Sequence, residues 1–168
     1  MGLANLWTML EGSKTPIFYR RLTWIAIFPL LSTGLGSQPS WGEDFEKILS
    51  FSLASSKSAY HRGEPVKLSL TVKNNSDHPV ILPFASAKHY DFVVTRGRQE
   101  LWRWSDGKMF AMGLTSLIVG PQESRRFEVT WLQTDRDGQK TKSGLYEAVG
   151  ILEIVGHPLS SSTSLQIE

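Results

Sequence analysis

No cysteine occurs in this chain of 168 residues. Disulfide bonds, thiolate zinc sites, cysteine nucleophiles and lipid-modified cysteine anchors are therefore excluded together. The fold must be stabilised by its buried core, and a chain of this length can bury enough surface for one domain. With 40% apolar and 20% charged residues, the composition is typical of a globular protein rather than a disordered one.

Sequence motifs for catalysis and for metal binding are also lacking. The sequence contains no nucleophile elbow of the G-x-S-x-G kind, no phosphate-binding loop and no dinucleotide-binding fingerprint. Its four histidines, His61, His78, His89 and His157, lie beside turn signals, and none pairs with another at the spacing of metal ligands. We therefore predict no catalytic residue, no metal site and no cofactor, and we expect a protein that is not an enzyme.

The longest nearly apolar run covers residues 22–31, which is short of the ~20 residues needed to span a bilayer. Arg20 and Arg21 precede this run, and small residues follow it up to Ser37. Positive, then apolar, then small residues is the order of a secretory signal peptide. We predict a signal peptide over residues 1–36 and a secreted or periplasmic mature protein. The alternative is an uncleaved anchor, which would be the protein's contact with the membrane.

Removal of this leader would leave a chain without net charge. The whole sequence has 18 basic and 16 acidic residues, and residues 1–36 contain three and one of these, so 15 of each remain. Residues 37–168 also contain no basic run, which is the electrostatic footprint of a nucleic-acid-binding protein. We therefore expect no nucleic-acid partner.

Turn residues divide the rest of the chain into short segments that alternate apolar and polar residues. The clearest segment covers residues 66–72, which alternate as in a strand with one buried face. The predicted strands cover residues 47–53, 66–72, 80–84, 90–95, 100–104, 115–119, 127–131, 145–155 and 163–167, with a loose turn at 160–164. This pattern predicts an all-β fold: an immunoglobulin-like β-sandwich of about seven to nine strands over residues 46–168, after a linker over residues 37–45.

Two further patterns concern the core. Tyr146, near the start of a predicted strand, resembles a tyrosine corner, in which the hydroxyl bonds back to the backbone; an ordinary core aromatic is the alternative. Ala148 would then take the position that antibody domains fill with cysteine. The period-2 spacing predicts one core formed by Val66, Leu68, Leu70, Val72, Phe127, Val129, Trp131, Tyr146, Leu152 and Ile154.

Aromatic residues concentrate within residues 90–110. On a strand, Trp102 and Trp104 would share one face, because side chains alternate between the two faces. Leu101 and Arg103 would share the other face. The tryptophans either fill the core or form an exposed platform for a partner, since aromatic side chains suit both. The candidate partner-binding residues are Trp102, Arg103, Trp104, Asp106, Gly107, Lys108, Met109 and Phe110.

A series of motifs gives the chain a family resemblance over residues 66–154. The motifs are residues 70–76, Phe84, Ser86, residues 90–92, 102–105 and 107–110, Gly120, Phe127, Trp131 and residues 144–146. In their order and spacing the chain resembles the BsuPI-type intracellular proteinase inhibitor domain. The resemblance implies an immunoglobulin-like sandwich and a proteinase inhibitor, and it carries over no reactive residue. The chain departs from the family pattern at Ala111 and Met112, where relatives carry Thr-Gln, and in its export signal.

These patterns together predict an exported, non-catalytic binding protein that inhibits an extracytoplasmic proteinase. Residues 105–109 would enter the cleft of the proteinase, because an Asp-Gly pair favours a tight turn. Lys108 would suit an acidic specificity pocket, and Met109 an apolar one. Such a protein needs no catalytic residue, since its affinity comes from a preorganised surface.

Three alternatives remain open at this point. The loop over residues 134–143, with Lys140 and Lys142, is a rival for the docking segment. Asp106 and Gly107 would alternatively do no more than close a hairpin. The protein would alternatively be an envelope or cell-surface binding or assembly module without inhibitory activity. If such a module bound carbohydrate, Tyr90, Trp102 and Trp104 would stack on the sugar rings.

Export of the protein is the first testable prediction. Mass spectrometry of the protein from its native host should find a mature chain that starts near Ser37, in the extracytoplasmic fraction. The reason is the order of charge, apolar run and small residues in the leader. A full-length protein that remains in the cytoplasm would contradict the prediction.

Overall fold

The computed structural model describes residues 45–168. The predicted signal peptide, residues 1–36, and residues 37–44 of the predicted linker lie outside the described residues. Phe45, the last residue of that linker, begins a single helical turn, α1 (Phe45–Ile48). Within the described residues no helix is long and apolar enough to cross a membrane.

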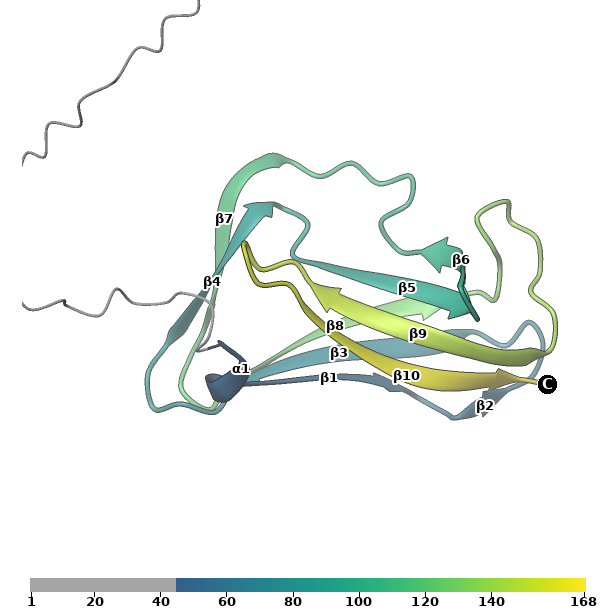
Figure 1. Cartoon of the computed structure of the whole chain (residues 1–168), viewed down its shortest axis with the longest axis horizontal. Helices are drawn as coiled ribbons and strands as arrows, with labels where there is room; N and C mark the ends of the chain where they lie inside the picture. Colours follow the sequence, from purple (N-terminus) through teal and green to yellow (C-terminus); the bar gives the residue numbers. More distant parts are fainter. Residues whose placement is uncertain (1–44) are drawn as a thin grey trace, which may run out of the picture. The chain divides into compact units, whose positions relative to one another are not determined.

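Ten strands form three hydrogen-bonded groups, as Figure 1 shows. The first sheet has the order β1 (Leu49–Ser55), β3 (Val66–Asn74), β8 (Ser124–Trp131). The second sheet has the order β2 (Ala59–Tyr60), β10 (Leu159–Ile167), β9 (Gly144–Leu152), β5 (Tyr90–Arg96), β6 (Gln99–Arg103). The third group is a two-stranded ribbon of β4 (Val80–Ser86) and β7 (Met112–Val119). All these pairs are antiparallel except that of β10 with β2.

The two larger sheets pack face to face, so the predicted immunoglobulin-like sandwich is confirmed. The predicted tyrosine corner is also present, since the hydroxyl of Tyr146 donates a hydrogen bond to the carbonyl oxygen of Lys142. The ring of Tyr146 packs on Trp131 with the centroids 5.6 Å apart, and Ala148 is fully buried beside them. These contacts fix the start of β9 against the first sheet.

Each predicted strand corresponds to a strand of the structure, but two predictions were wrong in detail. Residues 160–164 were expected to form a loose turn, yet they lie within β10 and pair with residues 147–151 of β9. The hydrogen bonds of the ladder hold this serine-rich segment extended despite its low strand propensity. The two-residue strand β2, which pairs with the end of β10, was not predicted. A segment this short has no detectable alternation.

The predicted core residues are buried with the exception of Phe127, which is partly buried. They do not form one core, however, because they divide between two neighbouring clusters. The first cluster, between the two sheets, contains Val66, Leu68, Leu70, Val129, Trp131 and Tyr146. The second, beneath the ribbon, contains Val72, Leu152 and Ile154. The ribbon divides the core because its inward side chains, Val80, Leu82, Phe84 and Val119, need a burial site of their own.

A buried asparagine joins the first sheet to the ribbon. Asn74, at the end of β3, is fully buried, and its amide nitrogen donates to the carbonyl oxygens of His78, Val119 and Gly120 at 2.7–3.0 Å. Its side-chain oxygen accepts hydrogen bonds from the backbone nitrogen and the hydroxyl of Ser76. A buried amide with all its hydrogen bonds made fixes local geometry, so the end of β7 is anchored here.

Leu70 offers the most direct test of the packing. Its side chain is fully buried, and a methyl group added at Gly150 would lie 2.5 Å from its Cδ1 atom. We expect Leu70→Ala to lower the free energy of unfolding by about 2–5 kcal/mol, since it leaves a cavity. The measurement is urea unfolding of the mature protein. The exposed Lys67→Ala serves as the control, and a change at Leu70 below ~0.5 kcal/mol would contradict the packing.

Candidate functional site

The candidate partner-binding residues lie where the chain leaves the second sheet for the ribbon. β6 is the last strand of the second sheet, and after Arg103 the chain makes two successive turns before it reaches β7. The amide of Asp106 donates to the carbonyl of Arg103 at 3.2 Å, and that of Lys108 to Ser105 at 3.1 Å. Gly107 has a φ of 72°, a left-handed conformation that favours glycine. The hairpin alternative was wrong, because β6 and β7 belong to different sheets and are not paired (Figure 1).

The expected alternation holds for Trp102 and Trp104, which both pack against the first cluster, but it was wrong for Leu101. Val94 of β5 pairs with Trp102, whereas Thr95 pairs with Glu100, so Leu101 is the extra residue of a β-bulge. The bulge breaks the two-residue period. Leu101 therefore packs against the first cluster together with Trp102 and Trp104, and each of the three is partly buried.

Aromatic rings beside the turn cover one another. The ring of Tyr90 lies 4.5 Å from that of Phe127 and 4.6 Å from that of Trp104, between centroids. Phe110 contacts Trp104 at 5.7 Å, and the amino group of Lys108 lies 4.5 Å above the Trp104 ring. We call Phe127, Tyr90, Trp104 and Phe110 the aromatic stack. The flat faces of Tyr90 and Trp104 are thus covered by neighbours of the same chain, and Trp102 packs against the first cluster, which favours the core alternative over an open platform.

Lys108 and Met109 point in different directions. The amino group of Lys108 turns back to donate a hydrogen bond to the carbonyl of Trp104. Met109 is 97% exposed, while the next residue, Phe110, packs inward on the aromatic stack. One residue further, the carbonyl of Ala111 accepts a hydrogen bond from the amide of Ala87 at 3.0 Å. The segment is therefore held on both sides of Met109, which is the side chain that projects into solvent.

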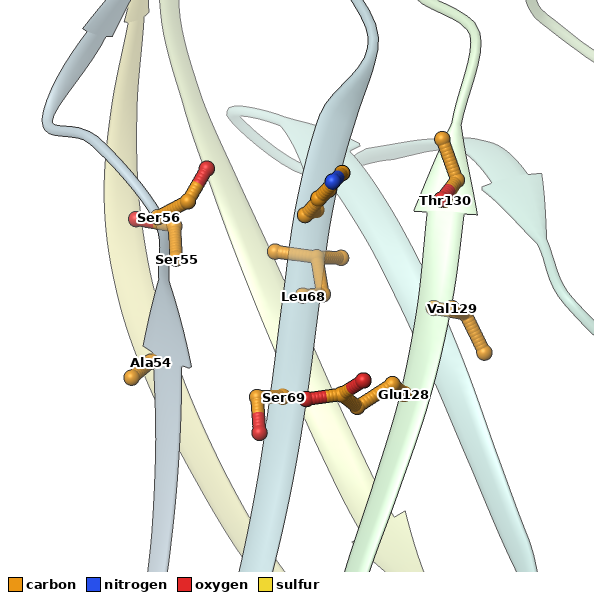
Figure 2. A pocket seen from close by; sticks show the side chains of 9 residues that line it. Ala54, Ser55, Ser56, Leu68, Ser69, Glu128, Val129 and Thr130 are labelled. Atoms are coloured by element: carbon orange, nitrogen blue, oxygen red, sulfur yellow. The ribbon is translucent and has the colours of Figure 1, made fainter.

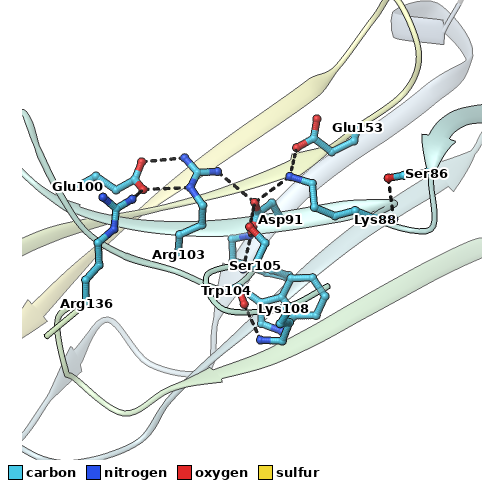
Figure 3. A network of polar contacts seen from close by, with 11 residues as sticks. Ser86, Lys88, Asp91, Glu100, Arg103, Trp104, Ser105, Lys108, Arg136 and Glu153 are labelled. Atoms are coloured by element: carbon cyan, nitrogen blue, oxygen red, sulfur yellow. Dashed lines mark hydrogen bonds and ion pairs between the residues drawn. The ribbon is translucent and has the colours of Figure 1, made fainter. Parts of the chain in front are cut away.

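The turn is held by the buried carboxylate of Asp91, which binds Ser105 (Figure 3). Asp91, on β5, is fully buried between the aromatic Tyr90 and Phe92 in the sequence. Its Oδ2 atom accepts from the hydroxyl of Ser105 at 2.6 Å, from Nη1 of Arg103 at 3.1 Å and from Nζ of Lys88 at 3.2 Å. Its Oδ1 atom accepts from the backbone amides of Phe92 and Ser105. A buried charge needs such partners, and here they join β5, β6 and the turn.

Further ion pairs extend this arrangement on both sides (Figure 3). On one side Lys88 pairs with Glu153 at 3.0 Å. On the other, Arg103 binds Glu100 through two nitrogens, at 2.7 and 3.0 Å. Arg136 contacts Glu100 and also pairs with Asp106 at 3.0 Å. We call these residues, together with Asp91 and Ser105, the Asp91 network.

The Asp91 network brings the rival loop next to the turn, because Arg136 belongs to residues 134–143. This loop is itself ordered by the hydrogen bond from the amide of Thr141 to the carbonyl of Gln133, at 2.8 Å. Gln133 is buried and donates to the carbonyls of His61 and Glu64. Ordering this loop on binding would therefore cost less conformational entropy than its length and few apolar residues predict. Its lysines are exposed, but the loop presents no projecting apolar side chain comparable with Met109.

The protonation states of the acids reflect these contacts. Burial alone would raise the pKa of Asp91, but hydrogen bonds from Ser105, Arg103 and Lys88 outweigh it and hold the pKa below its ordinary value of 3.8. The hydrogen bond from Arg103 likewise lowers the pKa of Glu100, and Glu100 in turn raises the pKa of Arg103. Both acids are therefore charged at neutral pH, as the pairing requires.

A shallow hollow of about 410 Å³ lies elsewhere, across β1, β3 and β8 of the first sheet (Figure 2). Small side chains produce it, since Ala54 pairs with Ser69 at its floor, beside Glu128. No pattern in the sequence predicted this hollow. In residues 45–168 no three histidine, aspartate or glutamate side chains converge closely enough to hold a metal ion. The hollow has no chemical feature that indicates a ligand.

Comparison with known proteins gives a family. The sequence profile of a family described as "BsuPI: Intracellular proteinase inhibitor" matches residues 53–156, which is more than half of the chain. No curated protein sequence matches the chain at a significant level.

Solved structures similar in fold include the CARDB domain of a Pyrococcus furiosus protein, at 12% identity and a TM-score of 0.42, over 71% of this chain and 87% of that one. The Bacillus subtilis sporulation control protein Spo0M matches at 19% identity and a TM-score of 0.41, over 71% of this chain and 48% of its own. Red sea bream transglutaminase matches at 12% identity and a TM-score of 0.46, over 72% and 16%. The chain thus spans less than half of the last two proteins.

The contacts of Asp91 predict a dependence of stability on pH. Because its pKa is lower in the folded state than in the unfolded chain, stability should fall as the pH drops from about 4 through the lowered pKa. We expect Asp91→Asn to destabilise the protein at pH 7 by on the order of 3 kcal/mol, since Lys88 and Arg103 each lose the buried one of their two carboxylate partners. Urea unfolding at pH 7 and pH 3 measures both effects, and the pH dependence should be smaller in Asp91→Asn.

The matched control for this experiment is Asp137→Asn, in an exposed position of the 134–143 loop. It should change the free energy of unfolding by less than ~0.5 kcal/mol. Equal stability of Asp91→Asn and the wild type at pH 7 would show that the Asp91 network does not stabilise the fold.

Proposed function

Since the chain belongs to the BsuPI family of intracellular proteinase inhibitors, we propose that it binds a proteinase and blocks its cleft, with no catalytic step of its own. Inhibition of this kind requires a rigid projecting segment that fills the cleft. It requires no nucleophile, acid or base, in keeping with the lack of catalytic motifs in the sequence. Residues 105–111 are the segment that we assign to this role.

The observation that supports this assignment is the exposure of Met109 on a segment that is fixed on both sides. On one side the turn is held by Asp91 through Ser105, and Trp104 is locked in the aromatic stack. On the other side Ala111 is bonded to Ala87. Little conformational entropy is then lost on binding. A small entropic cost leaves more of the contact energy available as affinity.

The side chain assigned to the specificity pocket is Met109, because Lys108 is folded back on Trp104. An unbranched thioether fills an apolar pocket and adapts to its shape. The proposed target is therefore a proteinase with an apolar primary pocket rather than an acidic one. The sequence alone did not decide between an acidic pocket for Lys108 and an apolar pocket for Met109, and the folded-back position of Lys108 favours the apolar one.

We further propose that the target is extracytoplasmic, on the strength of the predicted signal peptide alone. The family is described as intracellular, in contrast to the predicted export, so the location of this protein must be measured. The alternative function, an envelope module that stacks sugars on Tyr90, Trp102 and Trp104, has less support. Neighbouring side chains of the same chain cover the rings of Tyr90 and Trp104, and Trp102 packs against the first cluster.

A panel of serine proteinases titrated with the mature protein tests the proposal. We expect inhibition of enzymes with an apolar primary pocket. Met109→Ala should weaken the inhibition constant roughly tenfold to hundredfold, because burying a methionine side chain contributes about 1.5–3 kcal/mol. Lys108→Ala is the matched control, and it should change the constant less than Met109→Ala does.

Two results would contradict the proposal. If Met109→Ala inhibits as well as the wild type at unchanged stability, the assignment of the segment is wrong. If the wild type inhibits no member of the panel, the inhibitor function loses its support and the envelope module becomes the better account.

A further inference from the structure

The outer face of the β4–β7 ribbon is apolar and exposed. Ile81 on β4 is 60% exposed, and its cross-strand partner on β7, Ile118, is 54% exposed. Further along β7, Leu114 and Met112 are 86% and 87% exposed. Pro83, also exposed, lies between these positions on β4. We call Ile81, Pro83, Leu114 and Ile118 the ribbon face; Met112 lies beyond a β-bulge, where it pairs with Ser86.

The core does not account for these side chains. Along β4 and the end of β7, alternate residues already point inward and form the second cluster with Val72 and Leu152. The first five residues of β7, Met112 to Ser116, are all exposed, which is unusual for a strand with large apolar side chains. The ribbon therefore buries one side along β4 and the end of β7, whereas the start of β7 is exposed throughout.

The ribbon combines exposed apolar side chains with a lack of charge. No charged residue occurs between Lys108 and Glu123, a stretch that includes all of β7. The edge strands β6 and β8 carry Glu100, Arg103, Arg125, Arg126 and Glu128, whereas the edge strands β1 and β2 are uncharged. Neither β1 nor β2 exposes a large apolar side chain, however, while β7 exposes Met112, Leu114 and Ile118. Charged side chains on an edge oppose unwanted association, so an edge that lacks them and exposes large apolar side chains is typical of a surface that a partner covers.

The ribbon face is continuous with the proposed docking segment. β7 begins three residues after Met109, so Met112 and Leu114 follow the projecting side chain on the same stretch of chain. A proteinase–inhibitor interface buries about 800 Å² on each partner and involves about 20–30 residues a side. Residues 105–111 alone are too few for this. The neighbouring ribbon face is apolar, uncharged and exposed, and it adds the missing surface.

We propose that the ribbon face is the second part of the proteinase-binding surface and that it contacts an apolar patch on the proteinase beside the cleft. This inference rests on the proposed function. Met109 enters the cleft, while Leu114 and Ile118 dock outside it. Affinity then depends on both parts, and contacts outside the cleft persist when the cleft is filled by another group.

The test uses the most strongly inhibited serine proteinase of the panel in two forms. One form is active, and the other has its active-site serine sulfonylated by phenylmethanesulfonyl fluoride, which fills the cleft. Leu114→Lys and Ile118→Lys should weaken binding to both forms at least tenfold. Met109→Ala should weaken binding to the active form only. Leu132→Lys is the matched control, since Leu132 is 62% exposed and lies outside the ribbon face, and its binding should stay within twofold of wild type.

Each outcome separates the two proposals. If wild type inhibits the enzyme and Leu114→Lys and Ile118→Lys inhibit equally well with unchanged urea midpoints, the ribbon face is not part of the surface, and the proposed function stands. If wild type is a dimer by sedimentation, and Leu114→Lys dissociates it without loss of inhibition, the ribbon face binds a second copy and the inference is overturned. If wild type binds no proteinase, the proposed function fails, and this inference fails with it.

Discussion

The pairing of one buried carboxylate determines how the candidate site is held. Asp91 is the buried ionised side chain among the described residues, and burial without partners would be too costly to tolerate. Its partners come from three places: Lys88 before β5, Arg103 at the end of β6, and Ser105 in the turn. Satisfying this single charge therefore brings the turn onto the sheet. The aromatic stack then packs Trp104 and Phe110 beside it, and Met109, between these two in the sequence, is left exposed to solvent.

Packing beneath the ribbon sets the second constraint. The domain has two apolar clusters, with Phe51, Tyr90 and Phe127 in contact with both. The ribbon is attached through its inward side chains and through Asn74, whose amide binds the carbonyl of Val119. This attachment leaves the opposite face of the ribbon exposed. The exposure of Met109 thus follows from the contacts of Asp91, and the exposure of the ribbon face follows from the packing of the ribbon's inner side. The two exposed parts are neighbours in the sequence.

Much of the fold could be predicted, because alternation directly reports a half-buried strand. The alternating pattern of β3 is the clearest case, and the residues around Tyr146 match the pattern of a tyrosine corner. The bulge at Leu101 was not predictable from alternation, since it depends on how β6 pairs with β5. The Asp91 network was missed as well. An acid between two aromatic residues in a strand was a usable signal, but its partners lie up to 14 residues away and converge only in the folded chain. The exposure of β7 was not predicted, because a strand rich in apolar residues is ordinarily expected to bury at least one face.

The central claim is that the segment around Met109 is rigid before binding and is the part that a proteinase covers. Hydrogen–deuterium exchange of the mature protein, alone and in complex with a serine proteinase that it inhibits, tests it most directly. The account predicts slow exchange at the amides of Trp104 and Ser105 in the free protein, and new protection on binding over residues 105–118. Fast exchange at those amides, or protection confined to residues 134–143, would contradict it.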